Sequence, residues 1–105
     1  MPQPLTMDSL RERMLGIGFV EHATDPSNQY FDKRVTGAAI GRFADPIRDF
    51  VDAFDDESVC CIDVVPEASI VQLYVPDLDH VESYPYGSPE AEELISLAAV
   101  ATALR

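Results

Sequence analysis

The chain has 105 residues, 19 of them acidic and 7 basic, and a formal net charge of −12. An apolar fraction of 47% supports one hydrophobic core, so we expect a single small domain over residues 1–105. A charge of this sign repels nucleic acid and anionic membranes, which excludes direct DNA binding through a basic patch. The chain lacks both an apolar run that spans a bilayer and a signal-peptide pattern, so a cytoplasmic location is expected.

The first third of the chain predicts a helix followed by a hairpin. Met7, Leu10 and Met14 fall on one stripe at helical spacing and predict an N-terminal helix that packs on the core. Residues 19–23 and 29–35 are predicted to be two strands, because a turn-forming segment separates them.

A central helix is predicted from Asp45 onward, where an N-cap residue is followed by proline. Residues 36–43, just before it, are compatible with either a loop or a short irregular strand. Four apolar residues at helical spacing predict the buried face of the helix: Ile47, Phe50, Val51 and Phe54. Four carboxylates form a stripe on the opposite face: Asp45, Asp49, Asp52 and Asp56. Asp55 and Glu57 add negative charge at the end of the helix where the helix dipole disfavours it. The stripe is compatible with a solvated face and with a docking face for a basic partner.

The most apolar part of the chain, residues 58–76, predicts a central β-hairpin. One register places only apolar residues on the core face: Val64 opposite Val71, Ile62 opposite Leu73, and Cys60 opposite Val75. The other face is mixed, and we expect it to be partly covered or used in binding. Cys61 and Asp63 lie on it, and burial there would raise the pKa of Asp63. Both adjacent cysteines are expected to be reduced thiols.

Residues 77–87 allow more than one interpretation. Four side chains in this segment suit a hard metal ion: Asp77, Asp79, His80 and Glu82. Their spacing departs from that of an EF-hand loop, and residues 80–84 are alternatively a short edge strand. Tyr84 and Tyr86 fit a protein interface, because tyrosine is common at binding hot spots, and they equally fit rings packed over a turn.

The last helix is predicted over residues 89–104, after the capping residue Ser88. It is apolar on nearly all sides, so we expect it to contribute to a homodimer. Together the elements predict an α+β fold, in which an antiparallel sheet of two hairpins, with about four strands, packs against N-terminal, central and C-terminal helices.

Negative charge is concentrated in the second half of the chain. Residues 1–48 hold equal numbers of acidic and basic side chains, whereas Arg105 is the only base after residue 48. The sequence therefore predicts an acidic surface that docks on a basic protein. The predicted partner-binding residues are Asp45, Asp49, Asp52, Asp55, Asp56, Glu57, Asp77, Asp79, Glu82, Tyr84 and Tyr86.

The function predicted first is that of a non-enzymatic inhibitor, a nucleic-acid mimic that acts on a basic nucleic-acid-binding protein. The stripe of carboxylates repeats at about 5–6 Å, near the phosphate spacing of a strand. Phage anti-defence proteins, such as anti-CRISPR proteins, and nuclease-immunity proteins act in this way. The analogy with this chain rests on size and charge alone. No motif points to a catalytic centre, and no cofactor or metal is predicted.

Two other functions remain open. The near absence of lysine, with Lys33 alone, fits a salt-adapted or high-GC source, in which case the chain is a small regulatory or interaction module without a decoy role. A small metal-dependent enzyme is the second alternative.

Overall fold

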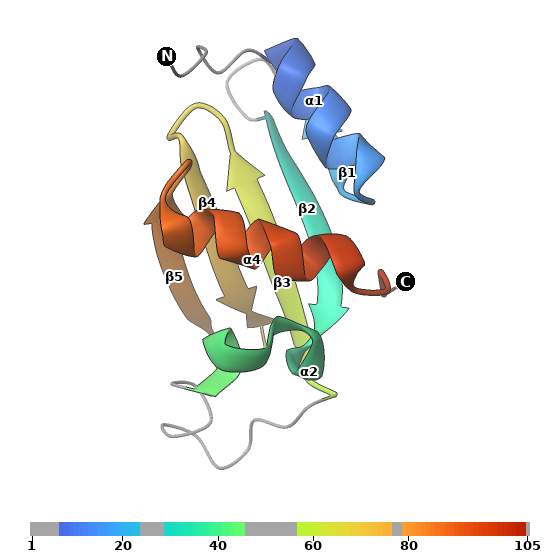
Figure 1. Ribbon diagram of the computed structural model, residues 1–105, viewed down its shortest axis with the longest axis vertical. Coiled ribbons are helices and arrows are strands. Elements are labelled where there is room, and N and C mark those ends of the chain that lie inside the picture. The colour runs from blue at the N-terminus through green and yellow to red at the C-terminus, as the bar shows by residue number, and fades with distance from the viewer. Residues whose placement is uncertain (1–6, 24–28, 46–56, 77–78, 105) are drawn as a thin grey trace.

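The fold is built around one antiparallel sheet with helices on one side (Figure 1). The computed structural model describes residues 7–23, 29–45, 57–76 and 79–104, and the predicted α+β class is confirmed. The elements in chain order are α1 (Met7–Gly16), β1 (Val20–Ala23), β2 (Gln29–Thr36), α2 (Gly37–Ile40), the 3-10 helix η1 (Gly41–Ala44), β3 (Val59–Val65), β4 (Ile70–Val75), β5 (His80–Pro85) and α4 (Pro89–Val100). The five strands lie in the sheet in chain order, each antiparallel to the next.

The central hairpin has the predicted register. Val64 pairs with Val71 and Ile62 with Leu73, and all four side chains are buried. The other edge of β3 pairs with β2, where Phe31 lies opposite Val64. The two predicted hairpins therefore join in one sheet, and the segment after β4 adds a fifth strand where the sequence indicated about four.

The described helices all lie on one face of this sheet. α4 crosses the middle of the sheet, α2 lies at one end, and α1 lies beside β1 and β2 (Figure 1). Their buried side chains fill the core against the strands: Leu10 and Met14 from α1, Ile40 from α2, and Ala91, Leu94, Ile95 and Ala98 from α4. The apolar stripe predicted for the N-terminal helix is thus confirmed at Leu10 and Met14.

The segment that precedes the predicted central helix is helical. Ile40 and Phe43, three residues apart, are both buried, and the N–H of Gly37 donates to the carbonyl of Ser58 at 2.8 Å. Two apolar residues are too short a pattern to indicate a helix, and the neighbouring glycines favour a loop, so the sequence left this segment open. Apart from Asp45, the predicted central helix lies outside the described residues.

α4 ends at Val100, before the predicted end at Leu104. No basic residue occupies its last turn, and the buried ammonium of Lys33 instead donates to the carbonyl of Ala98 at 2.7 Å. A cation at this position stabilises the negative end of the helix. The chain beyond the helix runs beside β2, where the N–H of Leu104 donates to the carbonyl of Arg34 at 2.8 Å.

The surface of α4 available to a second copy is smaller than the sequence suggested. Ile95 is buried within the monomer, whereas Val100 is 86% exposed. A homodimer through this helix remains a prediction. Among the described residues, no helix combines the length and apolar character needed to cross a membrane.

Candidate functional site

The face of the sheet opposite the helices is the candidate site, and it is called the open face below. No described helix lies on it (Figure 1). Three valines are prominent on this face, since Val20, Val59 and Val81 are 57%, 36% and 50% exposed. They lie on three different strands, β1, β3 and β5, so they add separate apolar points to this face.

Cross-strand pairing arranges the central part of the open face in three rows, spaced about 7 Å apart along the strands, and Val59 lies beyond them, opposite Thr36. The middle row, called the acidic row, consists of Val20, Asp32, Asp63, Gln72 and Ser83. On one side of it lies the row of Arg34, Cys61, Tyr74 and Val81. On the other side lies the row of His22, Tyr30, Val65, Ile70 and Pro85. Carboxylates therefore occupy the centre of the face, with aromatic and aliphatic side chains on both sides.

A hollow of about 410 Å³ opens on β2, β3 and β4 at the centre of the open face. It is lined by side chains of all three rows and by two neighbours: Gln29, Tyr30, Asp32, Arg34, Cys61, Asp63, Val65, Glu67, Gln72 and Tyr74. Its size and its mixture of apolar walls with a few polar groups match those of ligand and side-chain pockets.

Two carboxylates lie side by side in the lining of this hollow. Asp63 on β3 is directly opposite Asp32 on β2, and both side chains are partly buried. Asp32 contacts Nε2 of His22, whose ring stacks on Tyr30 with the ring centroids 4.7 Å apart. No ion pair joins Asp63 to a described lysine or arginine. The pair therefore concentrates negative charge at the centre of the open face.

The environment of Asp63 disfavours its ionised form. Burial first, and then the charge of Asp32, raise the pKa of Asp63, while His22 lowers it, and together they bring it to about 6. The carboxyl is therefore mostly ionised at pH 7, at a cost to the folded state. Asp63 therefore lies on the face predicted for it, and its partial burial raises its pKa as expected.

Cys61 lies beside these carboxylates but lacks the features of a nucleophile. Burial and the nearby charge of Asp63 raise the pKa of its thiol, while Arg34 lowers it. The resulting pKa is above the ordinary value, so the protonated thiol predominates at neutral pH. Cys60 is buried on the other side of the sheet, and both are free thiols, as predicted.

The described residues contain no group of three or more potential metal ligands placed to hold an ion. In the segment that suggested a metal site, Nε2 of His80 lies 3.4 Å from Oε1 of Glu82, on the edge strand β5. Asp79 is exposed in the turn before this strand, and Asp77 lies outside the described residues.

The predicted partner-binding residues fall into three groups. Asp49, Asp52, Asp55, Asp56 and Asp77 lie outside the described residues. Asp45, Glu57 and Asp79 are exposed, each at the end of a different element.

The third group makes contacts within the chain. The Tyr84 hydroxyl donates to Glu82 at 2.8 Å, and the Tyr84 ring packs edge-on against Phe43. Tyr86 accepts a hydrogen bond of 2.6 Å from Arg13, whose guanidinium also lies over the ring. These residues thus hold the end of the sheet and α1 together, whatever they bind outside the chain.

No family model, curated protein or solved structure matches the chain. The candidate site therefore rests on the geometry of the open face.

Sequence reasoning did not group His22 or Asp32 with Asp63, because the pairing of β2 with β3 is a contact between separate hairpins. The one available signal was the mixed character of the open face of the central hairpin.

Proposed function

We propose that the protein is a non-enzymatic, acidic binding protein that inhibits a basic nucleic-acid-binding protein. The observation that carries the proposal is the combination of a net charge of −12 with basic side chains that are engaged inside the fold. Such a surface attracts a basic partner over several ångströms, and it repels nucleic acid itself.

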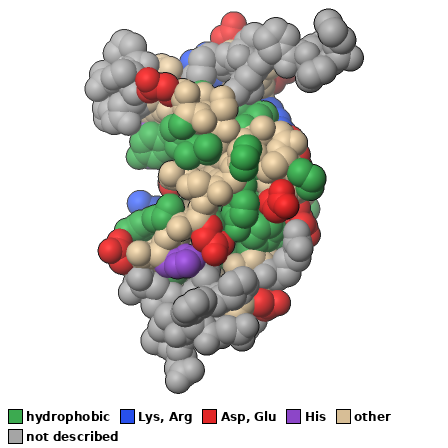
Figure 2. Space-filling model, turned by 90° about the vertical axis from the view of Figure 1, so that its left-hand side faces the viewer, with side chains coloured by type: hydrophobic (Ala, Val, Ile, Leu, Met, Phe, Trp, Pro, Cys, Tyr) green, Lys and Arg blue, Asp and Glu red, His purple; other side chains and the backbone are tan. Residues whose placement is uncertain are grey.

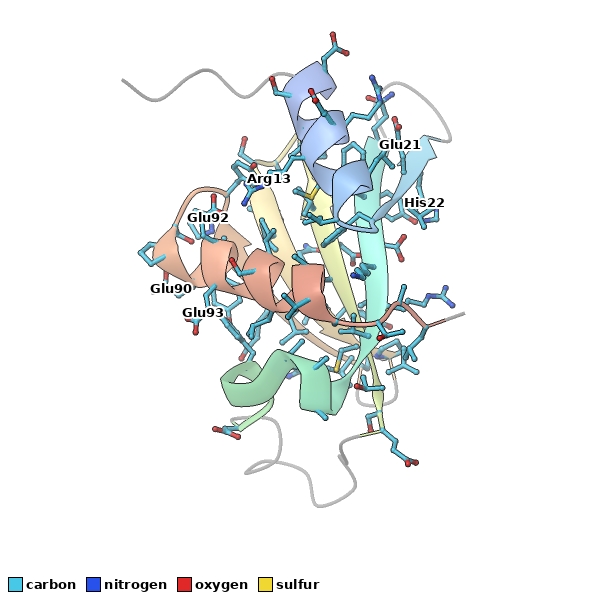
Figure 3. All side chains as sticks on the ribbon, turned by 45° about the vertical axis from the view of Figure 1, so that its right-hand side comes forward. Arg13, Glu21, His22, Glu90, Glu92 and Glu93 are labelled. Carbon is cyan, nitrogen blue, oxygen red and sulfur yellow. The ribbon has the colours of Figure 1, made fainter. Side chains whose placement is uncertain are left out.

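Three of the cations are used internally. Arg11 donates two hydrogen bonds to Glu21, of 2.9 and 3.1 Å, which joins α1 to β1. Arg13 reaches from α1 to Glu92 at the start of α4 (Figure 3). Lys33 is buried and donates to backbone carbonyls. These cations are therefore poorly placed to screen the carboxylates elsewhere on the surface.

Exposed carboxylates occur on several elements of the second half of the chain. They include Glu57 before β3, Glu67 in the β3–β4 turn, Asp79 before β5 and Glu90 on α4. Figure 2 shows the side of the molecule at β5, where acidic side chains lie at separate points among hydrophobic ones. The described carboxylates thus give a dispersed acidic surface, and the proposed imitation of phosphate spacing rests on the predicted stripe at Asp49, Asp52 and Asp56.

The experiment is capture at controlled ionic strength. The purified protein is immobilised, an extract of the source organism is applied at about 50 mM salt, and bound proteins are eluted by a salt gradient, because attraction between exposed charges weakens as the Debye length shortens. We expect basic nucleic-acid-binding proteins to be retained, eluted by salt and displaced by DNA. Retention of proteins without basic character, or retention unaffected by salt, would contradict the proposal.

The matched variant replaces Asp49, Asp52 and Asp56 with asparagine and is compared with Glu12→Gln, an exposed position on α1. If the stripe is the docking surface, the triple variant loses retention and Glu12→Gln keeps it. Full retention by the triple variant would show that docking uses another part of the acidic surface.

A further inference from the structure

The open face contains an arrangement that costs stability and that the fold does not need. An ionised carboxylate at the centre of a sheet is disfavoured by burial, and here Asp63 also faces Asp32. The side chain at this position of β3 packs on no helix of the described part of the chain, so asparagine or threonine would serve the sheet as well. A destabilising group retained at a concave, partly apolar surface is typical of a binding site.

We propose that the hollow lined by Asp32 and Asp63 receives an arginine side chain of the basic partner. This inference rests on the proposed function and adds the part of the open face that the partner contacts. The planar guanidinium has five N–H donors, which is enough to hydrogen-bond both carboxylates. Its positive charge would replace the mutual repulsion of the two acids by attraction.

The surroundings of the carboxylates fit arginine in particular. Tyr30 and Tyr74 lie in the rows on either side of the acidic row and line the same hollow. Tyrosine rings attract guanidinium groups through their faces and pack well on the aliphatic part of the side chain. Gln72, directly opposite Asp63 on β4, adds a side-chain carbonyl that can accept a further hydrogen bond.

One cation of the chain is already close, but it does not occupy this position. Arg34 is exposed and lies in the neighbouring row, opposite Cys61, where it lowers the pKa of the thiol. Burial, Asp32 and His22 set the pKa of Asp63, and no hydrogen bond or ion pair joins Arg34 to either carboxylate among the described residues. The place between the two acids is therefore open to an arginine from outside.

The apolar side chains around the hollow define the rest of the contact. Val59 and Val81 lie beyond Cys61 and Tyr74, and Val65 and Ile70 lie on the other side of the acidic row. A buried charged contact inside a ring of apolar groups is the arrangement found at binding hot spots. We therefore expect the arginine of the partner to be flanked by aliphatic residues.

The test is a titration followed by nuclear magnetic resonance. The probe is the capped peptide acetyl-Val-Arg-Val-amide, and its control is the same peptide with citrulline, which has the shape of arginine without the charge. We expect the arginine peptide to cause saturable shifts of the amides of Asp32, Asp63 and Gln72 at millimolar concentrations, and to lower the pKa of Asp63. The citrulline peptide should bind at least about ten-fold more weakly, a loss typical of a charged hydrogen-bonding group.

Two variants separate a local site from general charge attraction. Asp63→Asn should weaken the arginine peptide at least about ten-fold, whereas Glu12→Gln, with the same change in net charge on α1, should leave binding unchanged. Thermal unfolding of each variant checks that it is folded. The inference is overturned if the peptide causes no saturable shifts, if the shifts lie away from the open face, or if both variants weaken binding equally.

The peptide titration and the capture experiment can give opposite outcomes, so each tests its own proposal. If Asp63→Asn still retains basic proteins in a salt-dependent way, the proposed function stands and the arginine site does not. If the wild-type protein retains no basic protein, the proposed function falls, even where the peptide binds to the hollow.

Discussion

At the scale of single residues, Asp63 links stability to binding. Its folded pKa of about 6 is above the unfolded value of 3.8, so the folded state holds the proton more tightly. Tighter proton binding at Asp63 adds to the free energy of unfolding. This contribution is complete below pH 3.8 and is lost as the pH rises through about 6. Ionised Asp63 therefore lowers the free energy of unfolding at neutral pH.

The first prediction follows from this sign. Asp63→Asn, which resembles the protonated acid, should raise the free energy of unfolding by about 1–2 kcal/mol at pH 7.5. This is less than the free energy that corresponds to the whole pKa shift, because the side chain is partly exposed and solvent screens its charge. Near pH 4 the same substitution should have little effect. Urea unfolding at the two pH values measures the difference, and a variant that is less stable than the wild type at pH 7.5 would show that the carboxylate supports the fold.

Among the described residues, Lys33 is the polar side chain that is buried in the core, and a second prediction concerns it. Its ammonium donates to the carbonyls of Ile17 and Ala98 at 3.1 and 2.7 Å. Lys33→Met keeps the aliphatic volume but leaves both carbonyls without this donor, so the free energy of unfolding should fall by about 1–3 kcal/mol. Urea unfolding measures the loss. An unchanged midpoint would mean that water or another group replaces the ammonium.

At the scale of elements, α1 is held to the rest of the fold by a polar contact as well as by its apolar stripe. Arg13 bonds both to Glu92 on α4 and to Tyr86, and all three side chains are partly exposed. Arg13→Gln should therefore lower the free energy of unfolding by only about 0.5–1 kcal/mol, because solvent screens the ion pair. It should also increase amide hydrogen exchange in α1 more than in β3. Equal changes in both elements would contradict a local role.

The elements differ in how readily the sequence reveals them. The central hairpin is predictable because its strands alternate and its core face is entirely apolar in one register. α2 is not, since two apolar residues beside glycines give no clear period. The end of α4 is also not predictable from the local sequence. The lysine that stabilises this end, Lys33, comes from β2, and no local pattern shows that the helix stops at Val100.

The candidate site was only partly predictable for a related reason. The mixed face of β3 and β4 was evident from alternation, and so was the position of Asp63. Asp32 and His22 join it through the pairing of β2 with β3, which a single sequence does not specify. The acidic row thus forms only when the strands pair in the sheet, whereas the predicted stripe from Asp45 to Asp56 follows from the spacing within one helix.

At the scale of the whole molecule, the response to salt separates binding from adaptation. A net charge of −12 on a small domain causes self-repulsion, which salt relieves. We predict that the protein is fully folded at about 10 mM salt and gains only a few degrees in Tm at about 500 mM, because it has one continuous core. Circular dichroism during heating measures this. Loss of structure at low salt would instead favour the salt-adapted module.

The most direct test of the binding proposal is the affinity of the purified protein for the captured basic partner, measured by calorimetry over a salt series for the wild type and Asp63→Asn. We predict that the Kd of the wild type rises steadily with salt, and that Asp63→Asn binds at least about ten-fold more weakly at each salt concentration although it is the more stable protein. An affinity that is independent of salt would contradict an acidic docking surface. Equal affinities of the two proteins would show that the open face is not part of the docking surface.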